Sequence, residues 1–262
     1  MEIQLKEDEY LGEDGLPHCK HCKAPRMALI EDFYVHVICE CQKQELENKQ
    51  KEKRQQDLIT KQINSGISKK HMNAFFKNAQ ITSENKEIYK KLNSYVKNAR
   101  AMLDNNIGLF LTGPNSSGKT YAAACLCNEL IYAGYTCCFT NLFNLVQDKF
   151  KYEQTNRTAE TCNFVIIDDL GKEFIGREYD PSQAKFAERV LVEWIIQRYN
   201  ADLPVIITSN FELDDLLQRL SLDKTITERI NEMATRIIHF KETNFRDKNQ
   251  KHNSEIAKKF GI

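Results

Sequence analysis

One glycine-rich segment of the chain has residue types and a spacing that suit it to bind phosphate. Gly113 and Gly118 carry no side chain, so phosphate oxygens can approach the backbone N–H groups of the loop. Lys119 supplies a positive charge for the β- and γ-phosphates, and the Thr120 hydroxyl is suited to complete a Mg²⁺ shell. The predicted nucleotide site consists of Gly113, Pro114, Asn115, Ser116, Ser117, Gly118, Lys119 and Thr120.

Polar residues that could act on a bound phosphate follow two apolar runs further along the chain. Asp168 and Asp169 end the first run; we assign Asp168 to Mg²⁺ and Asp169 to activation of the attacking water. Asn210 follows the second run, and it would contact the γ-phosphate if its strand lies between the other two. Asp168 to Gly171 also match the Asp-x-x-Gly of GTPases, but no Asn-Lys-x-Asp segment that reads guanine follows. The sequence therefore favours ATP.

Four cysteines near the N-terminus have the spacing of metal ligands. Cys19 and Cys22 form a Cys-x-x-Cys pair, and Cys39 and Cys41 form a Cys-x-Cys pair. Four thiolates suit a closed tetrahedral Zn²⁺ site, which would order a segment too small to fold by itself. Three nearby histidines compete for one ligand position: His18, His21 and His36.

The remaining cysteines lie in or beside apolar stretches, where a reduced thiol packs as a small hydrophobe. The total of nine is odd and fits poorly with a pure disulfide framework. We interpret these five as structural: Cys125, Cys127, Cys137, Cys138 and Cys162.

The elements that must position the phosphate site alternate along the chain. From residue 107 onward, short β-rich runs alternate with helical patterns, which is typical of an α/β domain with a parallel sheet. We predict strands at 108–112, 136–140, 164–168, 204–208 and 236–240. We predict helices between them at 121–133, 141–152, 183–199 and 213–220, which together give a doubly wound sheet.

The composition is that of a globular protein. The 37 basic and 37 acidic side chains cancel, and 41% of the residues are hydrophobic, which excludes collagen-like, disordered and supercharged classes. No apolar run approaches the roughly 18 residues that a membrane span needs, and the acidic start lacks a secretory signal. We therefore expect a soluble, cytoplasmic protein without a membrane partner.

Three stretches of the sequence, in this order, resemble one family of ATPases. They are GLFLTGPNSSGKTYAAACLCNELIYAGYTCCFTN, FVIIDDLGKE and VLVEWIIQRYNADLPVIITSNFELDDLLQRL. The chain is similar over roughly 68–246 to the AAA+ ATPases of the DnaC/DnaI helicase-loader and IstB transposition-helper group. The resemblance implies a five-stranded parallel sheet of order 5-1-4-3-2, ATP-dependent assembly into a homo-oligomer and binding of single-stranded DNA. It also implies delivery of a hexameric replicative helicase onto DNA.

The chain departs from the family pattern at two places. Asn115, Ser116 and Ser117 replace the Pro-Gly-Thr in the middle of the phosphate loop, and we expect these small polar residues to accept the turn. The family often has two arginines four residues apart near the C-terminus, but here Thr225 stands at the first position and Arg229 at the second. The resemblance makes Arg229 the candidate for a charge contact to the γ-phosphate, in cis or in trans. Arg219 and Arg236 are possible substitutes.

The resemblance also suggests a division of the chain. We predict a zinc-binding module at 1–41, as in DnaI-type loaders, in which such a module contacts the helicase; transposition helpers generally lack one. A charged helical linker at 42–66, the AAA+ domain at 67–246 and a polar tail at 247–262 follow. The predicted function is a helicase loader with weak or partner-stimulated ATP hydrolysis. The alternatives are an IstB-like transposition helper and a non-hydrolysing adaptor.

The contact with DNA has two candidate locations. Residues 64–100 carry eight lysines and arginines against two acids, and aromatic residues lie among them: Phe75, Phe76, Tyr89 and Tyr95. Lysines that bind phosphates and aromatic rings that stack on bases would suit single-stranded DNA. Alternatively, these rings face the core. In AAA+ assemblies DNA usually meets elements that face the pore, which here would be residues 172–177.

Overall fold

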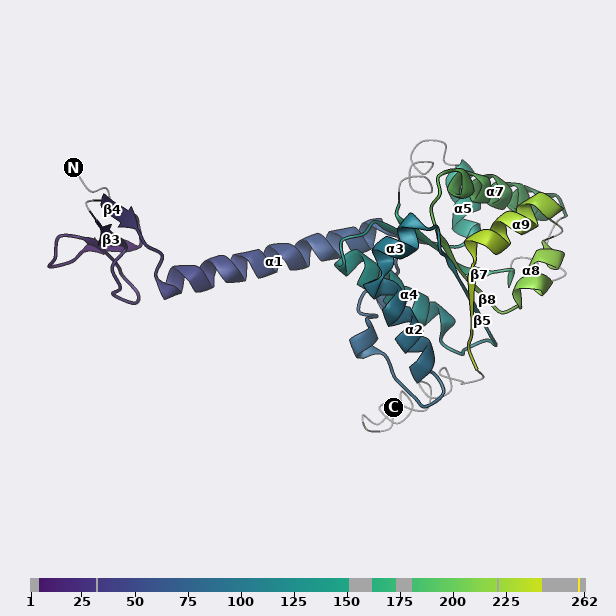
Figure 1. Cartoon of the computed structure of the whole chain (residues 1–262), viewed down its shortest axis with the longest axis horizontal. Coiled ribbons are helices and arrows are strands. Elements are labelled where there is room, and N and C mark those ends of the chain that lie inside the picture. The colour runs from purple at the N-terminus through teal and green to yellow at the C-terminus, as the bar shows by residue number, and fades with distance from the viewer. Residues whose placement is uncertain are drawn as a thin grey trace. The chain divides into compact units, whose positions relative to one another are not determined.

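The computed structural model describes residues 5–31, 33–150, 162–172, 181–220, 222–241 and 259. The chain divides into two compact units, residues 1–58 and 59–262. Figure 1 shows both units and labels most of their helices and strands.

The first unit consists of two small hairpins. Strand β1 (Glu9–Leu11) pairs with β2 (Pro17–Cys19), and β3 (Met27–Ile30) pairs with β4 (Phe33–His36), both antiparallel. The described residues of this unit contain no cluster of buried aliphatic or aromatic side chains. The few buried ones are Glu9, Pro17, Cys19, Arg26 and Cys39. Hydrophobic burial therefore stabilises this unit little.

Helix α1 (Glu40–Asn64) follows the hairpins. Its sequence is rich in Lys, Glu and Gln and contains neither glycine nor proline, so it favours a helix throughout. Almost all of its side chains are exposed, but Gln62 near its end is buried. The helical structure predicted for the charged segment is thus confirmed.

The second unit contains a five-stranded parallel sheet in the order β6-β7-β8-β5-β9. The strands are β5 (Leu109–Thr112), β6 (Cys137–Thr140), β7 (Phe164–Leu170), β8 (Val205–Ser209) and β9 (Arg236–His239). Numbered along the chain as strands 1 to 5, this order reads 5-1-4-3-2 from the β9 edge. The predicted strands and their order are confirmed.

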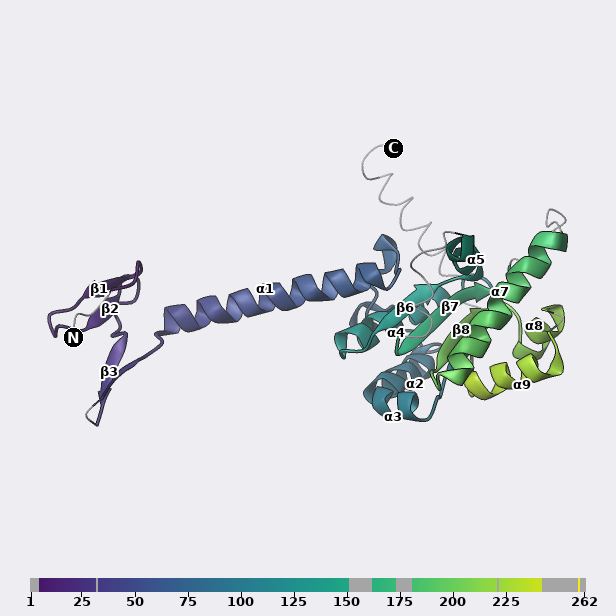
Figure 2. The ribbon, with the colours of Figure 1, turned by 90° about the horizontal axis from the view of Figure 1, so that it is seen from above.

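Helices cover both faces of this sheet (Figures 1 and 2). One side carries α2 (Lys86–Lys97), α3 (Ala99–Asp104) and α4 (Lys119–Tyr132). The other carries α5 (Leu142–Phe150), α7 (Pro181–Asn200), α8 (Leu213–Arg219) and α9 (Lys224–Met233). Two short 3₁₀ turns, η1 (Lys69–His71) and η2 (Phe76–Asn78), precede α2. This arrangement confirms the predicted doubly wound α/β fold.

The core lies between the central strands and the helices on the second face. Phe110, Val165 and Ile207 from three strands pack with Leu191 and Trp194 of α7 in one buried cluster. Strands buried on both faces read as continuous apolar runs, which is why the sequence pattern located them. Among the helices that the structure describes, none combines the length and the apolar character that crossing a bilayer requires.

The five cysteines of the second unit are buried or half-buried, as predicted. Cys125, Cys127 and Cys137 are buried, Cys138 and Cys162 are half-buried, and all five are free thiols. Burial raises the pKa of Cys125 to about 12, which keeps this thiol protonated at neutral pH.

Candidate nucleotide-binding site and cysteine cluster

The glycine-rich segment forms a tight loop between β5 and α4. Gly113 has φ 143°, and a Cβ at this position would lie 2.3 Å from the carbonyl oxygen of Phe240. Gly118 adopts φ 96° and directly precedes α4. Ser116 has a left-handed φ of 63°, where a side chain costs about 1–2 kcal/mol. The turn therefore forms despite the departure from the family's glycine, with strain at Ser116.

Lys119 is the buried cation of this loop. Its side chain is 4% exposed, and its ammonium donates hydrogen bonds of 2.8 Å to the carbonyls of Gly113 and Pro114. The ammonium is thus held beside the loop and at the N-terminus of α4, where the helix dipole also favours an anion.

A β-bulge places the two acids of β7 at the edge of the sheet. Ile167 pairs with Ile207 and Leu170 pairs with Ser209, so two acids of β7 lie opposite one residue of β8, Thr208. The second of these acids, Asp169, has a left-handed φ of 58°. Bulges of this kind redirect side chains, and here the bulge turns Asp168 and Asp169 out of the regular alternation of the strand.

Thr208 connects both acids, and the sequence analysis did not identify it. Its hydroxyl donates a 2.7 Å hydrogen bond to Oδ1 of Asp168 and accepts a 2.8 Å bond from the backbone N–H of Asp169. Thr120 donates to the same Oδ1 of Asp168 at 3.0 Å. The predicted Mg²⁺ ligands, Thr120 and Asp168, are therefore in direct contact. The one signal in the sequence was the position of Thr208 at the end of a predicted strand, two residues before Asn210.

The electrostatics of the two acids differ. Burial raises the pKa of the Asp168 carboxyl, and the neighbouring Asp169 raises it further, whereas the hydrogen bonds from Thr208 and Thr120 lower it. Asp169 is more exposed, and its Oδ2 forms an ion pair of 2.5 Å with the ammonium of Lys172. A cation placed between Thr120 and Asp168 would relieve the cost of the buried charge on Asp168.

A cavity of about 360 Å³ joins these residues. From the predicted site it is lined by Asn115, Ser116, Gly118, Lys119, Thr120, Asp169 and Asn210. Asn210 follows β8, which lies between β7 and β5, as its predicted role requires. The structure therefore brings the loop, the second acid and the asparagine to one cavity.

The rest of the cavity lining consists of residues that were not predicted to form the site. They are Lys70, His71, Asn78, Gln80, Tyr89, Tyr121 and Lys172. The rings of His71 and Tyr121 meet edge to face at a centroid distance of 6.4 Å. Partial burial and the charge of Lys70 lower the pKa of His71, so a neutral imidazole lies beside this space. Flat, largely uncharged side chains of this kind suit a heterocyclic base.

A buried polar network fixes this wall to α4. Asn128, which is fully buried, donates hydrogen bonds of 2.9 Å and 2.8 Å to the carbonyls of His71 and Ala74. It accepts one of 2.8 Å from Gln62, near the end of α1. The segment beside the cavity is therefore tied to the helix that follows the phosphate loop.

The candidate arginines lie away from this cavity. The guanidinium of Arg229 on α9 stacks at 5.0 Å over the ring of Tyr199, and that of Arg219 lies 4.4 Å over Phe211. Arg236 is exposed on β9. None of the three lines the cavity of its own chain, so this geometry offers no contact in cis.

Of the aromatic residues in the basic segment, Tyr95 faces the core, whereas Phe75, Phe76 and Tyr89 are half-buried. Tyr95 is buried, packs edge to face against Phe164 and donates its hydroxyl to the carbonyl of Ile107 at 2.7 Å. Phe76 packs against Tyr89. Of the other predicted DNA-contacting segment, 172–177, only Lys172 is among the described residues. The predicted polar tail at 247–262 lies outside them except for Lys259.

The four N-terminal cysteines meet in one cluster. The Sγ atoms of Cys19, Cys22, Cys39 and Cys41 all lie within 4.8 Å of one another. Four sulfurs about 2.3 Å from one tetrahedral zinc ion would lie about 3.8 Å apart, so the donor set fits zinc. A hydrogen bond from the backbone N–H of Cys22 lowers the pKa of Cys19 to about 6, which favours the thiolate that a metal requires.

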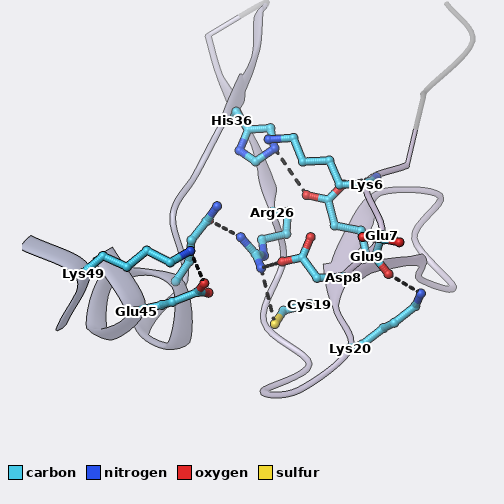
Figure 3. Close-up of polar contacts among 11 residues, drawn as sticks. Lys6, Glu7, Asp8, Glu9, Cys19, Lys20, Arg26, His36, Glu45 and Lys49 are labelled. Atoms are coloured by element: carbon cyan, nitrogen blue, oxygen red, sulfur yellow. Dashed lines mark hydrogen bonds and ion pairs between the residues drawn. The ribbon is translucent and has the colours of Figure 1, made fainter. Parts of the chain in front are cut away.

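The three histidines are not part of this cluster. His18 binds the Lys23 carbonyl through Nδ1 at 2.9 Å and the Asp14 carboxylate through Nε2. His36 lies 3.4 Å from the carboxylate of Glu9 (Figure 3). His21 is exposed and is not among the grouped ligand atoms.

The sheet order, the phosphate loop, the paired acids and the asparagine at the neighbouring strand end together define a P-loop ATPase of the AAA+ class. The family model described as "IstB-like ATP binding protein" matches residues 40–253. The chain belongs to this family. The match begins after Cys39, so it does not include the hairpins of the first unit.

Individual relatives agree with this assignment. The replicative helicase loader DnaC of Escherichia coli strain K12 is 22% identical over 166 residues, which cover 60% of this chain and 63% of the relative. The chain thus spans less than two thirds of the length of the curated relatives that it matches. A crystal structure of the DnaC helicase loader superimposes with a TM-score of 0.54 and 20% identity, over 67% of this chain and all of that chain. For a crystal structure of DnaI the TM-score is 0.51, with 22% identity over 68% of this chain and 93% of that chain.

Proposed function

We propose that the protein is an ATP-dependent loader that places a hexameric replicative helicase on single-stranded DNA. The observation that carries this proposal is the presence, on one chain, of a nucleotide cavity and a separate four-cysteine unit. The cavity supports an ATP-operated switch, and the cysteine unit supports a contact with a partner protein. DnaC, a relative by sequence and fold, is a replicative helicase loader.

The residues around the cavity have distinct parts in this proposal. Lys119 and the N–H groups of the loop hold the β- and γ-phosphates, and the His71–Tyr121 end of the cavity takes the adenine. Thr120 and Asp168 hold Mg²⁺, which neutralises phosphate charge when bound. Asp169 accepts a proton from the attacking water, and Asn210 orients that water against the γ-phosphate. Because Lys172 occupies one oxygen of Asp169, basal hydrolysis is slow and increases when a partner displaces this ion pair.

Binding of zinc by the four cysteines orders the first unit, which has almost no hydrophobic core of its own. We assign the helicase contact to this unit. Single-stranded DNA and a second copy of the chain are assigned to the ATPase unit, where Arg229 acts in trans on the γ-phosphate of a neighbouring copy. The exposed lysines of α2 offer a phosphate-binding face: Lys86, Lys90, Lys91 and Lys97.

The test is co-elution of the full chain with a hexameric replicative helicase, with and without ATP and Mg²⁺. We expect a stable complex with the wild-type protein. The double variant Cys19→Ser/Cys22→Ser should lose the complex and keep ATP binding, whereas Lys119→Ala should lose ATP binding and keep the first unit folded. Retained helicase binding in the cysteine variant would contradict the division of labour between the two units.

A second candidate function is assistance of DNA transposition, which the matched family name favours. In that case the partner is a transposase, and the purified protein would bind it rather than the helicase in the same experiment. A third candidate is a non-hydrolysing adaptor, in which ATP binding orders the protein but ATP is not hydrolysed. Steady-state turnover distinguishes it, because an adaptor releases no phosphate even with DNA and helicase present.

A further inference from the structure

Arg26 is the one arginine buried among the described residues of the first unit, and it is 1% exposed. A buried guanidinium is costly unless anions or hydrogen-bond acceptors compensate its charge. Because this unit has so few buried side chains, the buried charge of Arg26 requires specific contacts that compensate it.

The backbone fixes Arg26 between the two cysteine pairs. Its N–H donates to the carbonyl of Pro17 at 2.7 Å, and its carbonyl accepts from the N–H of Val37 at 2.8 Å. Pro17 lies two residues before Cys19, and Val37 lies two residues before Cys39. Arg26 is therefore bound to both segments that carry the clustered thiols.

Its side chain continues into the cluster (Figure 3). Nη2 donates to Sγ of Cys19 at 3.6 Å and also binds the carboxylate of Asp8, and Nη1 binds Oε1 of Gln42, the residue after Cys41. Nε–H is buried without a hydrogen-bond partner among the described residues. Arg26 thus makes the only cation–thiol hydrogen bond that the described residues give to this cluster.

We propose that Arg26 is the positioning residue of the metal site: it compensates the charge of the four thiolates and holds the Cys19 sulfur in place as a ligand. This inference rests on the proposed zinc site. Four thiolates around a divalent ion leave a net charge of −2, and the Arg26 guanidinium, which also pairs with the Asp8 carboxylate, offsets part of it. Outer groups that hydrogen-bond to metal ligands raise metal affinity by about 10–100-fold.

The test compares three variants of the full-length, zinc-loaded protein. Arg26→Met removes the charge and keeps most of the side-chain length, and Arg26→Lys keeps the charge but loses the planar fork. Lys20→Met is the matched control, because Lys20 is a cation next to Cys19 whose ammonium donates to the carbonyl of Glu7 and, among the described residues, to no sulfur of the cluster. The first readout is the rate at which each protein releases zinc to a chromogenic chelator. The second is the rate of N-ethylmaleimide modification at each cysteine, mapped by mass spectrometry.

For Arg26→Met we expect zinc release about tenfold faster or more. We also expect the rate of alkylation to increase by a larger factor at Cys19 than at Cys39, which is also buried, since the Arg26 side chain donates its hydrogen bond to Cys19. Arg26→Lys should fall between this variant and the wild type, and Lys20→Met should match the wild type.

Three outcomes would overturn the proposal in distinguishable ways. Equal acceleration at all four cysteines would show that Arg26 only holds the fold together. Release from Arg26→Met at the wild-type rate would remove its role toward the metal, and release from Arg26→Lys at that rate would refute the role of the planar guanidinium in holding the Cys19 sulfur. Wild-type protein that binds no zinc would refute the metal site itself, and with it the role of Arg26, while the ATPase proposal would stand.

Discussion

The contact that most directly links the structure of the ATPase site to its chemistry is the Thr208 hydroxyl. Replacing it in Thr208→Val keeps the shape of the side chain but removes the bond to Asp168 and the acceptor of the Asp169 N–H. A hydrogen bond to a charged group contributes about 1.5–3 kcal/mol, and a buried N–H left without a partner costs about 1–3 kcal/mol. Thr208 is fully buried, so water cannot replace the hydroxyl easily.

The expected destabilisation is therefore about 2–4 kcal/mol, since the two contributions share one hydroxyl and do not add fully. For a unit of this size each kcal/mol lowers Tm by about 2–4 °C, so a decrease of roughly 5–15 °C is expected in thermal denaturation. A shift of the acids by about 1 Å would lower kcat for ATP about 100-fold. The Kd of an ATP analogue measured without Mg²⁺ should change little, because Lys119 and the loop remain intact.

The matched control is Thr112→Val. Thr112 is an equally buried threonine on the adjacent strand. Its hydroxyl donates to the carbonyl of Phe211 at 2.7 Å and lies 3.4 Å from the carboxylate of Glu212, but it contacts neither acid of the bulge. It should lose stability by about 1 kcal/mol and retain turnover. An equal loss of kcat in both variants, or unchanged turnover in Thr208→Val, would refute the role that we assign to the bulge.

Three further predictions concern the same unit. Asp168→Asn should raise Tm at pH 7 in EDTA while abolishing turnover, because burial raises the pKa of Asp168 and its ionised form destabilises the fold. The gain in Tm should shrink as the pH falls through that raised pKa, and a gain that does not depend on pH would contradict this cause. Ser116→Gly should raise the free energy of unfolding by about 0.5–1 kcal/mol, because relief of the left-handed strain exceeds the added entropy of the unfolded chain, and urea denaturation that shows a loss would contradict it. Asn128→Leu should lower Tm by about 5–10 °C and weaken binding of an ATP analogue, because the carbonyls of His71 and Ala74 lose their donor. Unchanged affinity for the analogue would show that the hydrogen bonds of Asn128 do not support the cavity.

The sequence contained most of the fold of the ATPase unit, because its strands are buried on both faces and read as apolar runs. The strand order came from the resemblance to a family and not from the pattern itself. The clustering of the four N-terminal cysteines could also be predicted, because the spacing within each pair is typical of metal ligands and can be read from the local sequence. Five strands, the phosphate loop and the cysteine cluster could thus be anticipated.

The parts that could not be anticipated depend on pairing between distant segments. The bulge at Asp168–Asp169 arises from the register between β7 and β8, so the role of Thr208 became visible only in the structure. Arg26 is buried because its backbone forms hydrogen bonds with Pro17 and Val37, which lie in two separate segments. Nothing in the sequence distinguishes Arg26 from the other arginines in this respect. The rest of the cavity lining includes residues of the two 3₁₀ turns before α2, and these turns are too short for their sequence to show a periodicity.

We infer that ATP drives this protein to place a helicase on DNA. The most direct test is transfer of a hexameric replicative helicase onto circular single-stranded DNA, which has no end to thread. Helicase that stays on the isolated circle would be measured with wild-type protein and with Lys119→Ala, each with and without ATP and Mg²⁺. We expect loaded helicase only with the wild-type protein in the presence of ATP and Mg²⁺. Equal loading without ATP or by Lys119→Ala, or no loading by a protein that binds the helicase, would contradict it.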